Sequence, residues 1–484
     1  MDAIIIGSGF GGLGAALTLA QAGLDVLVLE TLNYPGGCAG TFVRDGAHFD
    51  AGATVAAGLG PGQLFRRWID TLELQVTGVP LDPAVQLRTP DQRITVPSNR
   101  EAFARQLAAL PNAPEGVEGF LATQGLVADA LWPLFSDPDL LPPLTMQSVS
   151  KHAGRAATYL PVLGTLGRTV EGVMARHGVA DFGPLRLAVD AALQITVQTH
   201  AAEADAAFGL SAMDFWFRQP MHISGGMGRL AEGLVEGIRG LGGRVSFADR
   251  ARTLTWREDR WEVQHRRGTS TAPVVIANLL PEAVGAMLGE APSALESMQR
   301  DVERGWGAAA LFCVLEDRDL PEEAFHLQLI GDQSAPLIEG NHLLVSVSAS
   351  HEVSRAGPGK RVATVSTHLR MPADATRIDS VQQRMREQLA RLAPELRIVS
   401  SLPASPRTYA RFTGRPDGWV GGPPRTRSLR NFMGVFPRPI RPGLYLVGDS
   451  AFPGQSTLAT AVGGHRIATL AMRQGAFTTR RKTG

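Results

Sequence analysis

Thirty residues at the start of the chain alternate between apolar runs and glycines in an order that few folds accommodate. Ala3–Ile6 is a continuous apolar run, as in a parallel strand buried on both faces, and Gly7–Gly12 (GSGFGG) follows directly. Leu13–Ala22 has the composition of a helix, and a second apolar run, Leu24–Leu29, ends at Glu30. This order of strand, glycine turn, helix, strand and acidic residue predicts a dinucleotide-binding Rossmann unit.

Each residue of the turn has a physical task in such a unit. Gly7 permits the tight turn, Gly9 lets the backbone approach a pyrophosphate, and Gly12 lets the helix pack on the strand. The helix N-terminus offers free N–H groups to phosphates. Glu30 can accept a hydrogen bond from a ribose 2′-hydroxyl, which favours FAD or NAD over a 2′-phosphorylated cofactor. The alternative is a turn that is only structural.

Two later segments favour FAD over NAD. Gly36-Gly37 and Gly40-Thr41 supply bare backbone amides soon after Glu30, where phosphates or a ribityl chain could lie. Gly448-Asp449 ends a late apolar run and returns a carboxylate to the same sheet edge. An elongated cofactor that is held from both ends of the chain fits FAD better than a freely exchanging nicotinamide.

The rest of the chain predicts an inserted second domain, because 484 residues exceed one ordinary core. Val79–Val96 is a predicted hairpin, residues 98–218 are mostly helical by pattern, and four alternating stretches between 309 and 368 predict a mixed or antiparallel sheet. We therefore expect an α/β fold with a discontinuous Rossmann-like FAD-binding domain (1–78, 219–290 and 405–484) and an α+β substrate domain (79–218 and 291–404).

Composition excludes several classes of function. A formal net charge of +1 lacks the basic excess of a nucleic-acid binder. Two cysteines, Cys38 and Cys313, exclude a disulfide framework and a multi-cysteine metal site, and we expect no metal. The sequence has no basic leader and no apolar run long enough to span a bilayer, so we expect a cytoplasmic protein.

Seven segments, in family order, resemble the phytoene desaturase-like FAD oxidoreductases, which comprise bacterial carotenoid desaturases and related carotenoid cis–trans isomerases. The segments are Gly7–Gly12, Glu30, Gly36-Gly37, Phe49–Gly52, Gly225–Met227, Val274–Asn278 and Gly448–Gln455. The last of them is the most discriminating. Gly357–Lys360 and Pro406–Gly422 are similar to the 3′,4′-desaturase branch. The resemblance implies a fold of the amine oxidase and phytoene desaturase type.

The resemblance also implies roles for individual residues. The pyrophosphate would lie at Gly7, Gly9 and Gly12, the adenosine ribose at Glu30, the adenine at Ala251, the flavin side at Gly36, Gly37, Gly40 and Thr41, the ribityl region at Gly448 and Asp449, and the isoalloxazine near Gln455, Ser456 and Thr457. The chain departs from the family pattern in two places. Asn33-Tyr34-Pro35 lacks a basic residue, and Ala251 stands where relatives have valine.

For function, the resemblance implies a carotenoid desaturase, in which FAD would accept a hydride equivalent from a long polyene and a C=C bond would form. The similarity to the 3′,4′-desaturase branch of the family implies that this bond would form at C-3′,4′. An isomerase that uses reduced FAD and, less favoured, a flavin amine oxidase remain alternatives, as does a non-catalytic lipid escort. The residue that removes the proton is not identified. An insoluble polyene would require peripheral docking on the inner face of the cell membrane. The oligomeric state is not predicted.

Several conspicuous residues have plainer interpretations. Cys38 is interpreted as a small filler beside the cofactor, and His222 as a structural histidine. Arg44, His48, Arg415 and Asp417 are candidates for loop or surface roles as much as for chemistry. The consecutive aromatics Phe215, Trp216 and Phe217 could line an apolar tunnel, but at least one must lie in the core because neighbouring side chains point in different directions.

Overall fold

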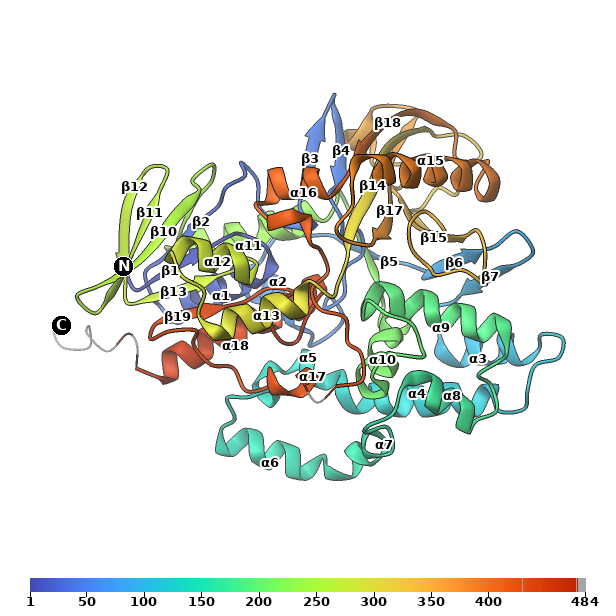
Figure 1. Cartoon of the computed structure of the whole chain (residues 1–484), viewed down its shortest axis with the longest axis horizontal. Coiled ribbons are helices and arrows are strands. Elements are labelled where there is room, and N and C mark those ends of the chain that lie inside the picture. Colours follow the sequence, from blue (N-terminus) through green and yellow to red (C-terminus); the bar gives the residue numbers. More distant parts are fainter. Residues whose placement is uncertain (429, 476, 478–484) are drawn as a thin grey trace.

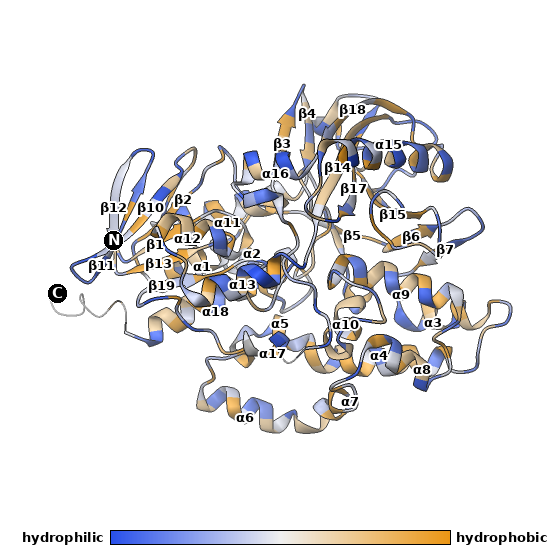
Figure 2. Ribbon diagram, viewed as in Figure 1, coloured by the Kyte–Doolittle hydropathy of each residue, from blue (hydrophilic) through white to orange (hydrophobic). Residues whose placement is uncertain are grey.

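A parallel five-stranded sheet organises the dinucleotide-binding part of the chain. The computed structural model describes residues 1–428, 430–475 and 477. The strand order is β19-β13-β1-β2-β9, with bounds β1 Ala3–Ile6, β2 Val26–Leu29, β9 Arg244–Ser246, β13 Val274–Ala277 and β19 Leu444–Leu446. Every residue of β1, β2 and β13 is buried, as expected for parallel strands covered on both faces. Figure 2 shows the hydropathy of these strands.

The two faces of this sheet are covered by different elements. Helices from three distant parts of the chain cover one face: α1 (Phe10–Gln21), α11 (Gly228–Gly240) and α18 (Thr457–Arg473). The other face packs against an antiparallel sheet and two helices, namely β10 Ala251–Arg257, β11 Arg260–His265, β12 Gly268–Ala272, α12 Pro281–Leu288 and α13 Ser293–Val302. The alternation along β1 divides Ile5 from Ile4 and Ile6 between these two layers.

The first and last helices of the fold, α1 and α18, touch backbone to backbone. A Cβ added at Gly464 would lie 2.0 Å from the Gly11 carbonyl oxygen, and one added at Gly14 would lie 2.6 Å from the Ala461 carbonyl oxygen. Glycine is therefore required on both helices at the crossing. This contact fixes the segment before α18 against the glycine turn before α1.

A mixed seven-stranded sheet forms the second layer system, in the order β18-β14-β17-β16-β15-β6-β7 (Figure 1). Its strands are β6 Val85–Arg88, β7 Arg93–Val96, β14 Gly307–Glu316, β15 Phe325–Ile330, β16 His342–Val347, β17 Lys360–Leu369 and β18 Ile398–Ala404. The pairing is antiparallel except between β15 and β6. The apolar face of this sheet packs against α15 (Ala375–Leu392), which leaves the opposite face free to form a wall.

A helical layer lies beside this sheet and has its own apolar core. Its helices are α3 Arg100–Ala108, α4 Val117–Leu131, α5 Pro133–Ser136, α6 Met146–Gly154, α7 Leu160–Leu163, α8 Val170–Arg176, α9 Gly183–Thr196 and α10 Ala206–Met213. The short helices α6 and α7 lie at the periphery of the molecule (Figure 1). No helix of the described residues is long and apolar enough to cross a membrane.

Buried charges join the two sheets. Asp50, at the end of β4 (Ala47–Asp50), accepts hydrogen bonds from Thr41, the Met227 N–H and Arg355, the last at 2.9 Å. Glu352 precedes the one-turn helix α14 (Val353–Ala356) and lies 2.8 Å from His222 Nε2. Its carboxylate also accepts from the backbone N–H groups of Gly225 and Ala349. These pairs pin the turn before α11 to the seven-stranded sheet.

The α/β fold with a Rossmann unit and a second mixed-sheet region is confirmed. The structure differs from the sequence-based expectations at two hairpins. Val79 belongs to β5 (Gly78–Pro80), which pairs with β8 (Met221–Ile223), and the hairpin itself begins at Val85. A further hairpin, β3 (Thr41–Arg44) with β4, was not predicted. Its turn, Asp45-Gly46, has positive φ at both residues, as a two-residue hairpin requires.

The buried Glu352 carboxylate makes the stability of the protein depend on pH. Burial opposes its ionisation, but His222, the Gly225 N–H and Arg355 together lower its pKa from 4.5 to about 2. A carboxylate with a lowered folded pKa stabilises the fold above its unfolded pKa, and this contribution is lost as the pH falls through the folded value. We expect Glu352→Gln to lower the free energy of unfolding by about 2 kcal/mol at pH 7.

Urea denaturation at pH 7 and at pH 3.5 measures this effect. The difference between the wild type and Glu352→Gln should shrink at pH 3.5, because Glu352 is then protonated in the unfolded wild type but still ionised in the folded one, so that folding must release a proton. Asp417→Asn, at an exposed carboxylate, is the control. An equal difference at both pH values would contradict the assignment.

Candidate functional site

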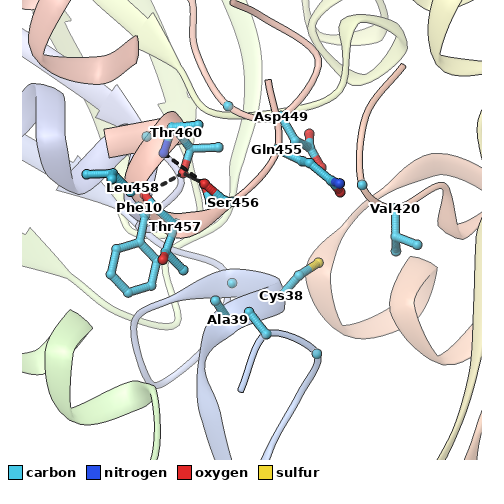
Figure 3. Close-up of a pocket in the computed structure, with 18 of the residues that line it drawn as sticks. Phe10, Cys38, Ala39, Val420, Asp449, Gln455, Ser456, Thr457, Leu458 and Thr460 are labelled. Atoms are coloured by element: carbon cyan, nitrogen blue, oxygen red, sulfur yellow. Dashed lines mark hydrogen bonds between the residues drawn. The ribbon is translucent and has the colours of Figure 1, made fainter. Parts of the chain in front are cut away.

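One cavity of about 1210 Å³ connects the carboxyl edge of the five-stranded sheet with the helical layer. Its lining includes the glycine turn after β1, the loop before α18, the free wall of the seven-stranded sheet and the inner faces of α9 and α10. Residues from both ends of the chain therefore enclose the same space. Figure 3 shows Cys38, Asp449, Gln455 and Thr457 around it.

The dinucleotide end of the cavity is a groove between glycines. Gly7, Gly9, Gly36, Gly37 and Gly448 all line it. A Cβ on Gly37 would lie 3.6 Å from the Cα of Gly9, and φ is +93° at Gly7 and +110° at Gly448. Side chains at these positions would be strained or would narrow the groove. Its dimensions thus depend on bare backbone, as a phosphate-binding turn requires.

Asn278 lies among the glycines of this groove, although no role for it was predicted from the sequence. It follows β13, and its side chain lies among the glycines: added Cβ atoms at Gly9, Gly11 and Gly448 would lie 2.5, 2.7 and 2.8 Å from its amide atoms. Its position after a strand of the same parallel sheet was a usable signal, because carboxyl ends of such strands gather at one edge.

Glu30 lines the groove and also supports it. Oε2 accepts hydrogen bonds from the Ser8 N–H and the Ser8 hydroxyl, both at 2.7 Å, and Oε1 accepts from the Leu32 N–H at 2.8 Å. A carboxylate has about four acceptor sites. One site therefore remains for a donor in the groove, such as a ribose hydroxyl, and the turn itself depends on the other three.

Asp449 faces the cavity as an ion pair and not as a free carboxylate. Arg415 donates to Asp449 Oδ2 at 2.8 Å and also to the Trp419 carbonyl. Cys38 lies beside this pair. Burial raises the pKa of the Cys38 thiol, the nearby Arg415 acts to lower it, and Asp449 acts to raise it. The thiol is therefore neutral, which fits a filler and not a nucleophile.

The start of α18 presents its N-terminus to the cavity. The Ser456 hydroxyl accepts from the Ala459 N–H at 3.0 Å and caps the helix, and Ser456, Thr457 and Leu458 line the cavity (Figure 3). Ser456 has φ of +97°, an unusual value for a residue with a side chain. Backbone strain of this kind is typical of functional sites. The N-terminus of a helix favours an electron-rich group, because it is the positive end of the helix dipole.

The other half of the cavity is mostly apolar on the helical side. Its wall there includes Leu131, Trp132, Leu134, Phe135, Val162, Phe208, Phe215 and Trp216. Phe217 instead packs on Phe103, with ring centroids 5.8 Å apart. Two of the three consecutive aromatics therefore line the cavity and the third lies in the helical core, as the sequence suggested.

The sheet side of this compartment is polar but uncharged. Alternate residues of β15 to β17 face it, including His326, Gln328, Ser346, Ser366 and His368. Burial lowers the pKa of His326 to about 3 and that of His368 to about 4, so both imidazoles are neutral at physiological pH. Among the described lining residues, the carboxylates are Glu30 and Asp449, both at the dinucleotide end.

Most of the predicted site residues meet at this cavity. Gly7, Gly9, Glu30, Gly36, Gly37, Ala251, Gly448, Asp449, Gln455, Ser456 and Thr457 line it. Three predicted residues lie outside the lining. An added Cβ at Gly12 would lie 2.0 Å from the Gly7 carbonyl oxygen, Gly40 packs against Gly36, and Thr41 bonds to Asp50 and the Gly228 N–H. His222 is bound to Glu352 and does not line this cavity either.

Comparison with known proteins supports the fold of the nucleotide end. Residues 5–72 match the family model of the NAD(P)-binding Rossmann-like domain. An oxidoreductase from Methanosarcina mazei superposes with a TM-score of 0.67 at 19% identity, covering 97% of this chain and 100% of that one. A putrescine oxidase superposes with a TM-score of 0.63 at 15% identity, covering 98% and 99%. At these identities the likeness concerns the fold alone.

Sequence similarity extends over almost the whole chain for one group of proteins. A chloroplastic prolycopene isomerase of an Oncidium hybrid cultivar is 25% identical over 529 residues, covering 96% of this chain and 84% of that protein. A neurosporene-forming phytoene desaturase of Cereibacter sphaeroides is 36% identical over 124 residues, covering 25% of this chain and 24% of that protein. The chain is thus similar to prolycopene isomerases throughout and to phytoene desaturases in part.

Proposed function

We propose that this protein is an FAD-dependent enzyme that introduces a C=C bond into a long polyene of the carotenoid class. The observation that carries the proposal is the single cavity that joins a dinucleotide groove to an apolar compartment. The similarity to phytoene desaturases and prolycopene isomerases gives the substrate class. The bond at C-3′,4′ remains the finer hypothesis, because it rests on the two loop segments named in the sequence.

The residues present fit FAD along its length. The backbone of Gly9 and Gly37 lines the groove where the pyrophosphate would lie, and Glu30 has one acceptor site left for the ribose. Asp449, neutralised by Arg415, would lie at the ribityl chain, and the start of α18 would lie at the isoalloxazine. Bound FAD would accept the hydride equivalent that leaves one carbon of the polyene, and the neighbouring carbon would lose a proton to a weak base or to water.

The protein itself would contribute to the reaction by positioning the polyene and excluding water more than by acid–base chemistry. The aromatic wall of α10 and its neighbours would exclude water from a bound polyene and would hold its reacting carbons at a fixed place. No aspartate or glutamate among the described lining residues reaches the apolar half, and the two buried histidines there are weak bases. Such a site suits a substrate whose conjugation spreads the developing charge.

Isomerisation is the second candidate, because the full-length similarity is to prolycopene isomerases. In that reaction no hydrogen is lost from the polyene. An amine oxidase is not proposed: no lysine is found among the described lining residues, and the likeness to a putrescine oxidase concerns the fold alone.

Expression in bacteria that accumulate a carotenoid decides between the two reactions. A desaturase should yield a pigment that absorbs at longer wavelength and is about two mass units lighter for each bond formed, since two hydrogens leave. An isomerase should change the spectrum and leave the mass unchanged. Pigments that match the empty-vector control in both measurements would count against both reactions.

The two carboxylates of the groove should control cofactor retention. We expect Glu30→Gln and Asp449→Asn each to weaken FAD binding about tenfold, because each removes charge-assisted hydrogen bonds at the groove. The ratio of flavin absorbance to protein after dialysis measures this, with exposed Asp417→Asn as the matched control. Fully yellow preparations of both variants would refute these assignments.

We further propose that a lipid bilayer is where the polyene enters. Seven apolar side chains around α6 and α7 are 42% to 86% exposed: Leu126, Leu144, Met146, Val149, Leu160, Leu163 and Leu166. On α7, Val162 lines the cavity whereas Leu160 and Leu163 face outward, so the exposed patch adjoins the apolar compartment. An apolar patch at the mouth of an apolar cavity is suited to insertion between lipid headgroups. Location at the inner face of the cell membrane remains a prediction.

Vesicle flotation tests this docking. We expect the triple variant Met146→Ser, Leu160→Ser and Leu163→Ser to bind phosphatidylcholine–phosphatidylglycerol vesicles at least about tenfold more weakly than the wild type, since three apolar side chains leave the lipid. The control is Ile398→Ser with Val399→Ser, two exposed apolar residues on the edge strand β18. Equal loss of binding in the control variant would show that the effect is not specific to α6 and α7.

A further inference from the structure

A cation lines the apolar half of the cavity without a carboxylate beside it. Arg425 is partly buried and lines the cavity, and its guanidinium donates to the Pro453 carbonyl at 3.0 Å. It makes no ion pair with any carboxylate of the described residues. Asp301 is the carboxylate that acts on it from a distance, and Asp301 is already paired with Arg430 at 3.2 Å.

Other arginines deep in the fold are better compensated. Arg355 pairs with Asp50 at 2.9 Å, and Arg415 pairs with Asp449 at 2.8 Å. Arg466 makes three hydrogen bonds to the carbonyls of Pro142 and Val435. Desolvation lowers the pKa of Arg425 to about 10, which still leaves it charged at neutral pH. A desolvated cation with one carbonyl partner is costly unless an anion joins it.

The surroundings of Arg425 indicate which kind of anion would fit. The guanidinium carbon lies 5.6 Å from the centre of the Phe208 ring, and Phe208 packs on Phe432 with centroids 5.3 Å apart. Phe208 and Ala212 lie one turn apart on α10, and Phe215 follows in the 3-10 helix Asp214–Phe217; all three line the cavity, so an apolar stripe, the α10 stripe, leads away from the cation. The ligand would therefore be anionic at one end and apolar along its length.

We propose that Arg425 anchors the carboxylate of a long, unsaturated acid whose chain lies along the α10 stripe. The guanidinium presents its donors in a plane that matches a carboxylate with two hydrogen bonds. This proposal goes beyond the polyene reaction proposed above, because a pure hydrocarbon would leave the charge of Arg425 uncompensated. It concerns binding and does not depend on turnover.

Fluorescence titration with cis-parinaric acid and with its methyl ester tests the anchor. This conjugated acid becomes fluorescent in an apolar site, and the ester lacks the charge and carries one added methyl group. We expect the full-length protein, as purified, to bind the acid about tenfold more tightly than the ester, since hydrogen bonds to a charged group are strong. Arg425→Gln should remove this preference and leave ester affinity unchanged, and Arg425→Lys should retain part of it.

Arg427→Gln is the matched control, because Arg427 is exposed two residues away and does not line the cavity. Equal affinity of the wild type for acid and ester would overturn the proposal without any variant. A preference for the acid that survives Arg425→Gln would also overturn the proposal. The same holds if Arg425→Gln keeps this preference and changes only the reduction potential of bound flavin. Failure of the pigment experiment would leave the binding result standing, so the two proposals can fail separately.

Discussion

The contact between α1 and α18 is the constraint on which the site depends. Gly11 and Gly14 on one helix, and Gly464 on the other, allow the two backbones to touch. Because α1 starts at the glycine turn and α18 starts at the capped Ser456, their crossing sets the separation of the two walls of the groove. A methyl group at this crossing would push apart two helices that lie near opposite ends of the sequence but are in contact in the fold.

Charge is distributed in the cavity in a way that follows its two halves. The carboxylates Glu30 and Asp449 lie at the nucleotide end, and each is engaged by neighbouring donors. The apolar half has neutral imidazoles on the sheet and aromatic rings on the helices. Among the described lining residues of that half, Arg425 is the charged one. Its charge bears on which ligand this half can bind more than on the stability of the fold.

The sequence was most informative where local rules decide the structure. The first thirty residues predicted β1, α1 and β2 because buried parallel strands and a glycine turn leave direct marks in the residue order. The hairpin of β3 and β4 was missed although Asp45-Gly46 is a strong turn signal, since its strands lack the continuous apolar runs that mark β1 and β2. Three-residue β5 carries a proline and could not be separated from the hairpin that follows.

The sequence can place a residue such as Asn278 at the sheet edge, but it cannot show a role that depends on tertiary contacts. Asn278 stands after a predictable strand, but its wedging among three glycines depends on how β13 and β1 are registered. Arg425 is one of many arginines, and only the folded chain shows that no described carboxylate accompanies it. The ion pair of Arg415 with Asp449 likewise joins two loops that the sequence alone does not bring together.

The use of both chain ends for one groove has a consequence for biosynthesis. While residues 457–473 are still being synthesised, the glycine face of α1 lacks its packing partner α18. The helix start that Ser456 caps has not yet formed. Long-range contacts of this kind form late, after the intervening segments have found their places. A dinucleotide would therefore meet a complete groove only after α18 has packed on α1, and a chain stopped short of α18 would be left with half a groove.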